Sequence, residues 1–216
     1  ADVEVHDACR KIAILTSLIS GQHVDFEKIH TEGITKITTE DMKYAKKLNM
    51  AIKLLASSKR VGDTFSVLVA PMLLSEEHPL CNVNDVFNAV FVRGNMLGDA
   101  MFYGSGAGKL PTASAVVADV VDAAKHLHRN VVTRWDAGEL ELIPNAEAEH
   151  RFFVRVQGRS EAQKEQIREA FGSVEIVETE GLEDEFGFIT EVMTEGTYSK
   201  KAEAFPEIIH MIRLAD

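Results

Sequence analysis

Roughly the last 70 residues carry the pattern that most restricts the fold of this chain. Apolar residues alternate at 152–156, 174–176, 186–192 and 208–214, with helical stretches at 160–171 and near 198–204. Alternation in steps of two is typical of strands with one buried face, and spacings of three and four are typical of helices. The order strand, helix, strand, strand, helix, strand predicts a split βαβ sandwich of ferredoxin-like type. We therefore expect one domain over residues 148–216 and another over residues 1–147.

The first domain mixes helical and strand patterns in a different order. Residues 7–20 predict a helix that ends at Gly21 and buries Ala8, Ile12, Leu15 and Ile19. A polar helix should begin at Thr38, whose hydroxyl is followed three residues later by the carboxylate of Asp41. A longer helix is expected at 112–127. Strands are expected at 31–37, 50–56, 64–71, 86–92, 97–103 and 139–143. The whole chain is therefore expected to be an α+β protein.

Composition excludes several classes of protein. The net charge of −11 disfavours a basic face that could coat phosphates, so nucleic acid is a poor candidate partner. No apolar run approaches the ~20 residues that a membrane-spanning helix needs. The first residues lack the pattern of a secretory signal, and two cysteines make no disulfide framework, so a cytoplasmic protein with reduced thiols is expected. No histidine stands at metal-ligand spacing, and no metal site is predicted.

Asp7 and Lys11 are the first candidates for chemistry. Four residues apart on a helix, they share one face. One interpretation is a surface ion pair. The other is a lysine held by a carboxylate for proton transfer near neutral pH. The spacing alone leaves both open.

A glycine-rich run at residues 104–108 is the second candidate. It lies between an expected strand and an expected helix, where backbone amides can approach an anionic ligand. It matches neither the dinucleotide fingerprint nor the P-loop, because Lys109 stands where the former needs glycine. A flexible turn is the other interpretation.

Several runs, in order over residues 1–130, closely resemble the homoserine dehydrogenase family. The runs with the clearest likeness are Asp2-Val3-Glu4, Asp7-Ala8-Cys9-Arg10-Lys11-Ile12, Thr31-Glu32-Gly33-Ile34, His78-Pro79-Leu80, Asn88-Ala89-Val90, Gly106-Ala107-Gly108 and Pro111-Thr112-Ala113-Ser114. The resemblance implies a mixed β-sheet with helices on one face that also forms a homodimer through residues 31–104. The tail resembles an ACT-type regulatory domain.

The resemblance also implies a reaction and its residues. The family interconverts L-homoserine and L-aspartate 4-semialdehyde with NAD or NADP in threonine and methionine biosynthesis. The catalytic lysine falls on Lys11, its partner on Asp7 and a substrate-binding aspartate on Asp2. Gly106 and Gly108 fall where the family touches the cofactor.

This chain departs from the family pattern in three places. It shows no N-terminal dinucleotide-binding domain, so NAD or NADP is expected only in a full-length enzyme and the 216 residues alone should be inactive. Val5 stands where the family usually has glycine. The tail lacks the aspartate-x-x-glycine turn with which ACT domains often hold an amino acid. The alternative function is a non-catalytic, dimeric regulatory or assembly module.

Overall fold

The structure is a computed structural model that describes residues 5–132 and 135–215. It consists of two compact units. The first combines Ala1–Ser75 with Trp135–Asp216, and the second is Glu76–Arg134. In the described part of the chain, no helix is both long enough and apolar enough to span a membrane.

A seven-stranded mixed sheet forms the centre of the first unit. Its strands run in the order β1 (His30–Thr31), β3 (Thr64–Ser75), β11 (Ile208–Leu214), β7 (Phe152–Gln157), β9 (Glu185–Thr190) and β8 (Val174–Val177), and β2 (Met50–Val61) pairs with β3. β3 runs parallel to β1 and β11, and the other pairs are antiparallel. The prediction of an α+β protein with a mixed sheet is confirmed.

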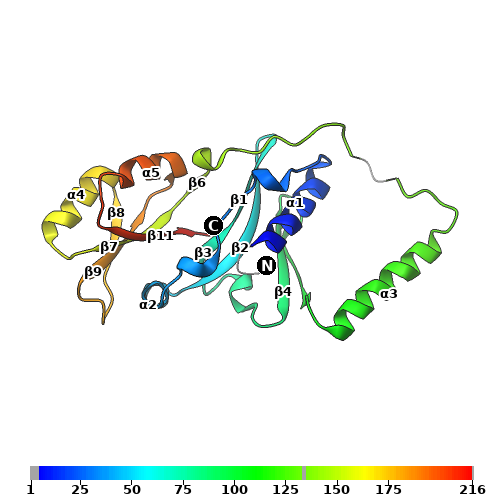
Figure 1. Cartoon of the computed structure of the whole chain (residues 1–216), viewed down its shortest axis with the longest axis horizontal. Coiled ribbons are helices and arrows are strands. Elements are labelled where there is room, and N and C mark those ends of the chain that lie inside the picture. Colours follow the sequence, from blue (N-terminus) through cyan, green and yellow to red (C-terminus); the bar gives the residue numbers. More distant parts are fainter. Residues whose placement is uncertain (1–4, 133–134, 216) are drawn as a thin grey trace. The chain divides into compact units, whose positions relative to one another are not determined.

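Helices cover this sheet on both faces. α1 (His6–Ser20) packs on the face of β3 that holds Val67 and Val69, and α2 (Thr39–Lys47) packs on the same face at Leu73. α4 (Glu161–Phe171) and α5 (Glu195–Ala202) cover the opposite face of the later strands (Figure 1). The first part of the sheet thus has its helices on one face, as expected, whereas β7 lies between helices and is buried on both sides.

Local signals in the sequence predict the helix ends well. Thr38 with Asp41, and Ser160 with Gln163, form capping boxes in which each side chain accepts the other residue's backbone N–H. Gly21, with φ 75°, ends α1 in the left-handed conformation that glycine adopts without strain. The order β7, α4, β8, β9, α5, β11 matches the predicted order of elements in the tail.

Three predictions were wrong. The strand at 31–37 is limited to His30–Thr31, and a 3-10 turn follows at Ile34–Lys36. The strand at 139–143 is reduced to two isolated bridges, which join Glu139 to His23 and Leu142 to Phe65. The third, the buried face of α1, is wrong in part. Ile12 is buried as expected and Ala8 and Leu15 are half-buried, whereas Ile19 is 67% exposed, and Cys9, Ala13, Thr16 and Ser17 are buried instead.

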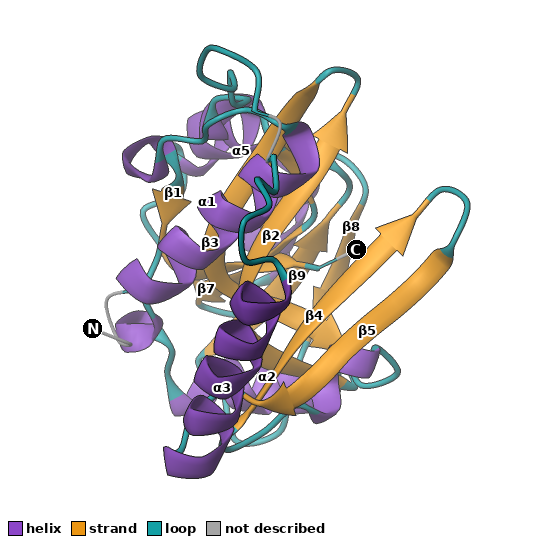
Figure 2. Cartoon of the chain, turned by 90° about the vertical axis from the view of Figure 1, so that its right-hand side faces the viewer, coloured by secondary structure: helices purple, strands orange, loops and turns teal. Residues whose placement is uncertain are grey.

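The second unit exposes most of its apolar side chains. β4 (Phe87–Gly94) and β5 (Gly98–Ser105) form an antiparallel hairpin, and α3 (Lys109–Lys125) follows (Figure 2). No residue of α3 is buried, and its apolar residues Val116, Val117 and Val120 are about 60% exposed. Phe102 of the hairpin is 70% exposed. Within the described chain, this unit therefore has a large apolar surface.

The sheet continues across the predicted domain boundary at 147/148. The last strand, β11, pairs in parallel with β3 through Arg213 opposite Met72 and Leu214 opposite Leu73. A short ribbon of β6 (Glu149–His150) and β10 (Met193–Thr194) lies just after the boundary. The division into domains 1–147 and 148–216 stays a prediction.

Candidate active site

The expected pair of Lys11 and Asp7 forms on the outer side of α1. Lys11 Nζ lies 2.7 Å from Asp7 Oδ2, and the two side chains are 66% and 56% exposed. An exposed pair of this kind contributes only ~0–1 kcal/mol to stability. The pair is therefore accessible to a ligand, and the fold does not depend on it.

The inner side of α1 is fixed by polar contacts as well as apolar packing. The Thr16 hydroxyl donates to Ser58 Oγ on β2 at 2.8 Å, and Ser17 Oγ accepts the backbone N–H of Val24 at 3.0 Å. The Cys9 thiol donates to the carbonyl of Phe26. These contacts hold the rotation of the helix about its axis, so Lys11 and Asp7 keep their outward direction.

The chain enters α1 through an unusual backbone conformation at Val5. Its φ of 57° and ψ of 8° are left-handed, and its side chain is only 3% exposed. A residue with a β-carbon adopts this conformation at a cost of about 1–2 kcal/mol, which glycine avoids. The position where the sequence departs from the family's glycine is thus a position where glycine would be unstrained. The predicted substrate residue Asp2 lies outside the described residues.

Gly106 and Gly108, the predicted cofactor contacts, lie in the second unit between β5 and α3. The Gly106 N–H donates to the carbonyl of Val86 at 3.2 Å, which extends the hairpin by one residue. Gly108 is the N-cap of α3 with φ 122°, and no side chain caps that helix end. The loop therefore presents backbone rather than side chains, an arrangement that suits the close approach of a dinucleotide.

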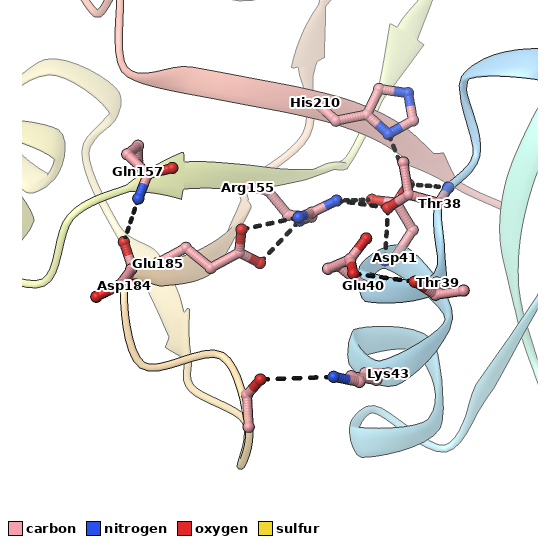
Figure 3. Close-up of polar contacts among 11 residues, drawn as sticks. Thr38, Thr39, Glu40, Asp41, Lys43, Arg155, Gln157, Asp184, Glu185 and His210 are labelled. Carbon is pink, nitrogen blue, oxygen red and sulfur yellow. Dashed lines mark hydrogen bonds and ion pairs between the residues drawn. The ribbon is translucent and has the colours of Figure 1, made fainter.

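Sequence reasoning missed two buried charge clusters that join the tail to the first part of the chain. In the first, Arg155 is 4% exposed and contacts Asp41 at 2.9 Å and Glu185 at 2.8 Å (Figure 3). His210 Nδ1 lies 3.0 Å from the other oxygen of Asp41. Burial raises the pKa of Asp41, but hydrogen bonds from His210, the Thr38 amide and Arg155 outweigh it and hold that pKa at about 2.

The second cluster is built around Arg213, which is 2% exposed. Its guanidinium donates to both oxygens of Glu195, and its Nη2 also lies 2.7 Å from Glu32 Oε1. His30 Nε2 lies 2.7 Å from the same Glu32 oxygen. Burial raises the pKa of Glu32, and the contacts with His30 and Arg213 more than offset it, so the pKa falls to about 2. The only signal in the sequence was an arginine inside each apolar strand.

The described residues contain no group of three or more histidine, cysteine or acidic side chains that could hold a metal ion. The chemistry of the candidate site is therefore that of an exposed lysine–aspartate pair on a firmly packed helix, and separately of a glycine loop that opens a helix.

Comparison with known proteins matches this class of α+β protein to a family of oxidoreductases. The sequence model of homoserine dehydrogenase matches residues 1–121. Homoserine dehydrogenase of Neisseria gonorrhoeae is 37% identical over 74% of this chain, and that of Mycobacterium tuberculosis is 34% identical over 96%. The chain belongs to the homoserine dehydrogenase family.

Solved structures agree with the sequence comparison. A homoserine dehydrogenase from Thiobacillus denitrificans matches all of this chain with a TM-score of 0.87 and 30% identity. One from S. aureus at pH 6.5 matches with a TM-score of 0.78 and 26% identity. The chain spans 39% and 52% of the two curated relatives above and 54% of each of these structures, which is about half of their length.

Proposed function

We propose that this chain supplies the catalytic part of an enzyme that interconverts L-homoserine and L-aspartate 4-semialdehyde with NADP or NAD. This reaction belongs to threonine and methionine biosynthesis. The observation that carries the proposal is the Lys11–Asp7 pair, which stands 2.7 Å apart and exposed within the region that the family model matches.

Lys11 acts as the proton donor and acceptor at the substrate oxygen. In the direction of reduction, the ammonium of Lys11 gives a proton to the aldehyde oxygen as that carbon gains a hydride; in oxidation, the neutral amine takes the hydroxyl proton. Asp7 orients Lys11 and the substrate ammonium, and Asp2 contributes to substrate binding. The cofactor, when bound, supplies or accepts the hydride.

The glycine loop fits a role beside the cofactor. At Gly104 an added β-carbon would meet no atom within 4 Å, so the backbone there stands open. Gly106 and Gly108 follow on the same loop and lead into the uncapped start of α3. These residues would hold part of NADP or NAD through backbone groups, and the remainder of the cofactor site belongs to a dinucleotide-binding domain outside this sequence.

We also propose that the full-length enzyme is a homodimer built through residues 31–104. The prediction of a single sheet over these residues was wrong, because β1, β2 and β3 belong to the seven-stranded sheet and β4 and β5 form a separate hairpin. The exposed Phe102, Tyr103 and Val86 of the hairpin region support this, because an apolar surface of this kind usually marks an interface. Sedimentation at micromolar concentration tests it, and a clean monomer would count against it.

The tail is proposed to be an ACT-like domain over residues 148–216. The order of its neighbouring strands, β11, β7, β9 and β8, with both crossover helices on one face, supports this assignment.

A turnover assay tests the proposed reaction. We expect no oxidation of L-homoserine by the purified 216-residue chain with NADP or NAD, and turnover once an N-terminal dinucleotide-binding domain from a relative is joined to it. Lys11→Ala in the joined protein is the matched control. Turnover by the 216-residue chain alone would contradict the proposal that it supplies only one part of the enzyme. A folded, NADPH-binding fusion without turnover would favour a regulatory or assembly module instead.

A further inference from the structure

One face of the β4–β5 hairpin carries a single polar side chain. Residues two apart on a strand share a face, so even-numbered residues of both strands lie together. On that face stand the apolar residues Val90, Val92, Ala100 and Phe102, with glycine at 94, 98 and 104. Asn88 is the exception. It is exposed, and within residues 5–132 and 135–215 nothing hydrogen-bonds to its carboxamide.

The position of Asn88 places this amide against the glycine loop. Asn88 lies opposite Gly104 in the register, so no side chain faces it across the hairpin. The loop then passes over Asn88. A β-carbon at Gly106 would lie 1.7 Å from Asn88 Nδ2 and 2.5 Å from its Cγ. Any side chain at position 106 would push the amide away, and glycine leaves it in place.

The carboxamide of Asn88 offers hydrogen-bonding groups that the apolar side chains on the same face lack. A carboxamide carries two donors and an acceptor, and an apolar side chain of similar shape would pack on the neighbouring valines without them. Because the amide is uncharged and both donates and accepts, it suits neutral polar groups such as an amide or ribose hydroxyl better than a phosphate.

We infer that Asn88 is a further cofactor-contacting residue, whose carboxamide hydrogen-bonds an uncharged polar group of the nicotinamide dinucleotide held at the Gly104–Gly108 loop. The inference rests on the proposed function. In this arrangement Gly106 has a second task besides exposing backbone. It keeps open the space through which the Asn88 amide reaches the ligand.

The test is the substitution Asn88→Leu, which keeps the size of the side chain and removes its hydrogen-bonding groups. Binding of NADPH to the full-length enzyme is followed by the fluorescence of NADPH. We expect the dissociation constant to rise about 10-fold, which corresponds to the loss of one hydrogen bond. Val90→Ala, on the same face and one position further from the loop, should leave it unchanged.

A second measurement separates ligand contact from an effect on the loop. Hydrogen exchange of the amides of residues 104–109 in the 216-residue chain should be the same with asparagine or leucine at position 88. Unchanged NADPH affinity in Asn88→Leu would overturn the inference, and so would faster exchange in the loop alongside the weaker binding. An enzyme that binds NADPH but does not oxidise homoserine would refute the proposed function. The NADPH affinities of wild type and Asn88→Leu would then still decide whether Asn88 contacts the cofactor. An enzyme that does not bind NADPH would refute both.

Discussion

The buried carboxylate of Asp41 offers the sharpest test of the link between the tail and the first part of the chain. Asp41 is fully buried, and its carboxylate forms hydrogen bonds with Arg155 at 2.9 Å, with His210 at 3.0 Å and with the Thr38 N–H at 2.8 Å. Asp41→Asn keeps the shape of the side chain but removes its charge. It also turns an amide NH₂ toward groups that themselves donate hydrogen bonds.

The magnitude follows from the pKa of Asp41, which falls from an ordinary 3.8 to about 2. Each pKa unit corresponds to ~1.4 kcal/mol, so the ionised form contributes about 2–3 kcal/mol to the free energy of unfolding. Breaking one partner of a buried pair commonly costs ~3–5 kcal/mol, and Arg155 retains Glu185 as a partner, so the lower figure is expected.

The dependence on pH has a definite sign. Because the pKa of Asp41 is lower in the folded state, its stabilising effect is fully present above the unfolded pKa of 3.8 and is lost as pH falls toward about 2. Urea unfolding at pH 7, 5, 4 and 3 should therefore show that the free energy of unfolding of wild type exceeds that of Asp41→Asn by a constant amount down to about pH 5. Below about pH 5 this difference should become smaller.

The pair of half-buried Arg159 and exposed Glu183 provides the control. Its atoms lie 3.0 Å apart, but the Glu183 side chain is 72% exposed, and Glu183→Gln should change stability by only ~0–1 kcal/mol. A gap for Asp41→Asn below about 1 kcal/mol at pH 7, or one as large at pH 3 as at pH 7, would refute the reasoning.

Three further outcomes are expected. Lys11→Ala in the full-length enzyme should lower kcat by about 10²- to 10⁴-fold with unchanged urea unfolding and dimerisation; near-normal kcat would remove the catalytic role. Arg213→Met should lower the free energy of unfolding by about 3–5 kcal/mol, whereas Arg159→Met should change it little, and equal effects in urea titrations would contradict the importance of the buried cluster. Val5→Gly should cost about 1–2 kcal/mol less than Val24→Gly, because both side chains are 3% exposed but only Val5 is left-handed; equal losses on thermal unfolding would show that Val5 is unstrained.

Local chemistry explains which features could be predicted from the sequence. The cap at Thr38 and the turn at Gly21 depend on residues a few positions apart, and both appear as expected. The cap at Ser160 depends on the same local spacing. The Lys11–Asp7 contact, one helical turn in length, was predictable for the same reason. Its chemical role is a different matter, because spacing does not distinguish a surface pair from a proton donor.

The features that sequence reasoning missed depend on distant parts of the chain. Arg155 and Asp41 are 114 residues apart, and Arg213 and Glu32 are 181 apart, so no local pattern joins them. The prediction of which face of α1 is buried was partly wrong for another reason. Ile14, Leu18 and Ile19 are as apolar as Ile12, so periodicity offers two candidate faces. The hydrogen bonds of Thr16 and Ser17 decide between them.

The parallel pairing of β11 with β3 also sets the order in which the protein can fold during its synthesis. Met72 of β3 pairs with Arg213 of β11, so this part of β3, one of the most buried strands, can complete its pairing only after about 140 more residues have been synthesised. Contacts so distant in sequence form slowly, and until they form, the edge of β3 that pairs with β11 exposes backbone groups and apolar side chains to other chains. We expect nascent chains of this protein that stop before residue 208 to depend on chaperones, even where α1, α2 and the β2–β3 hairpin have already formed.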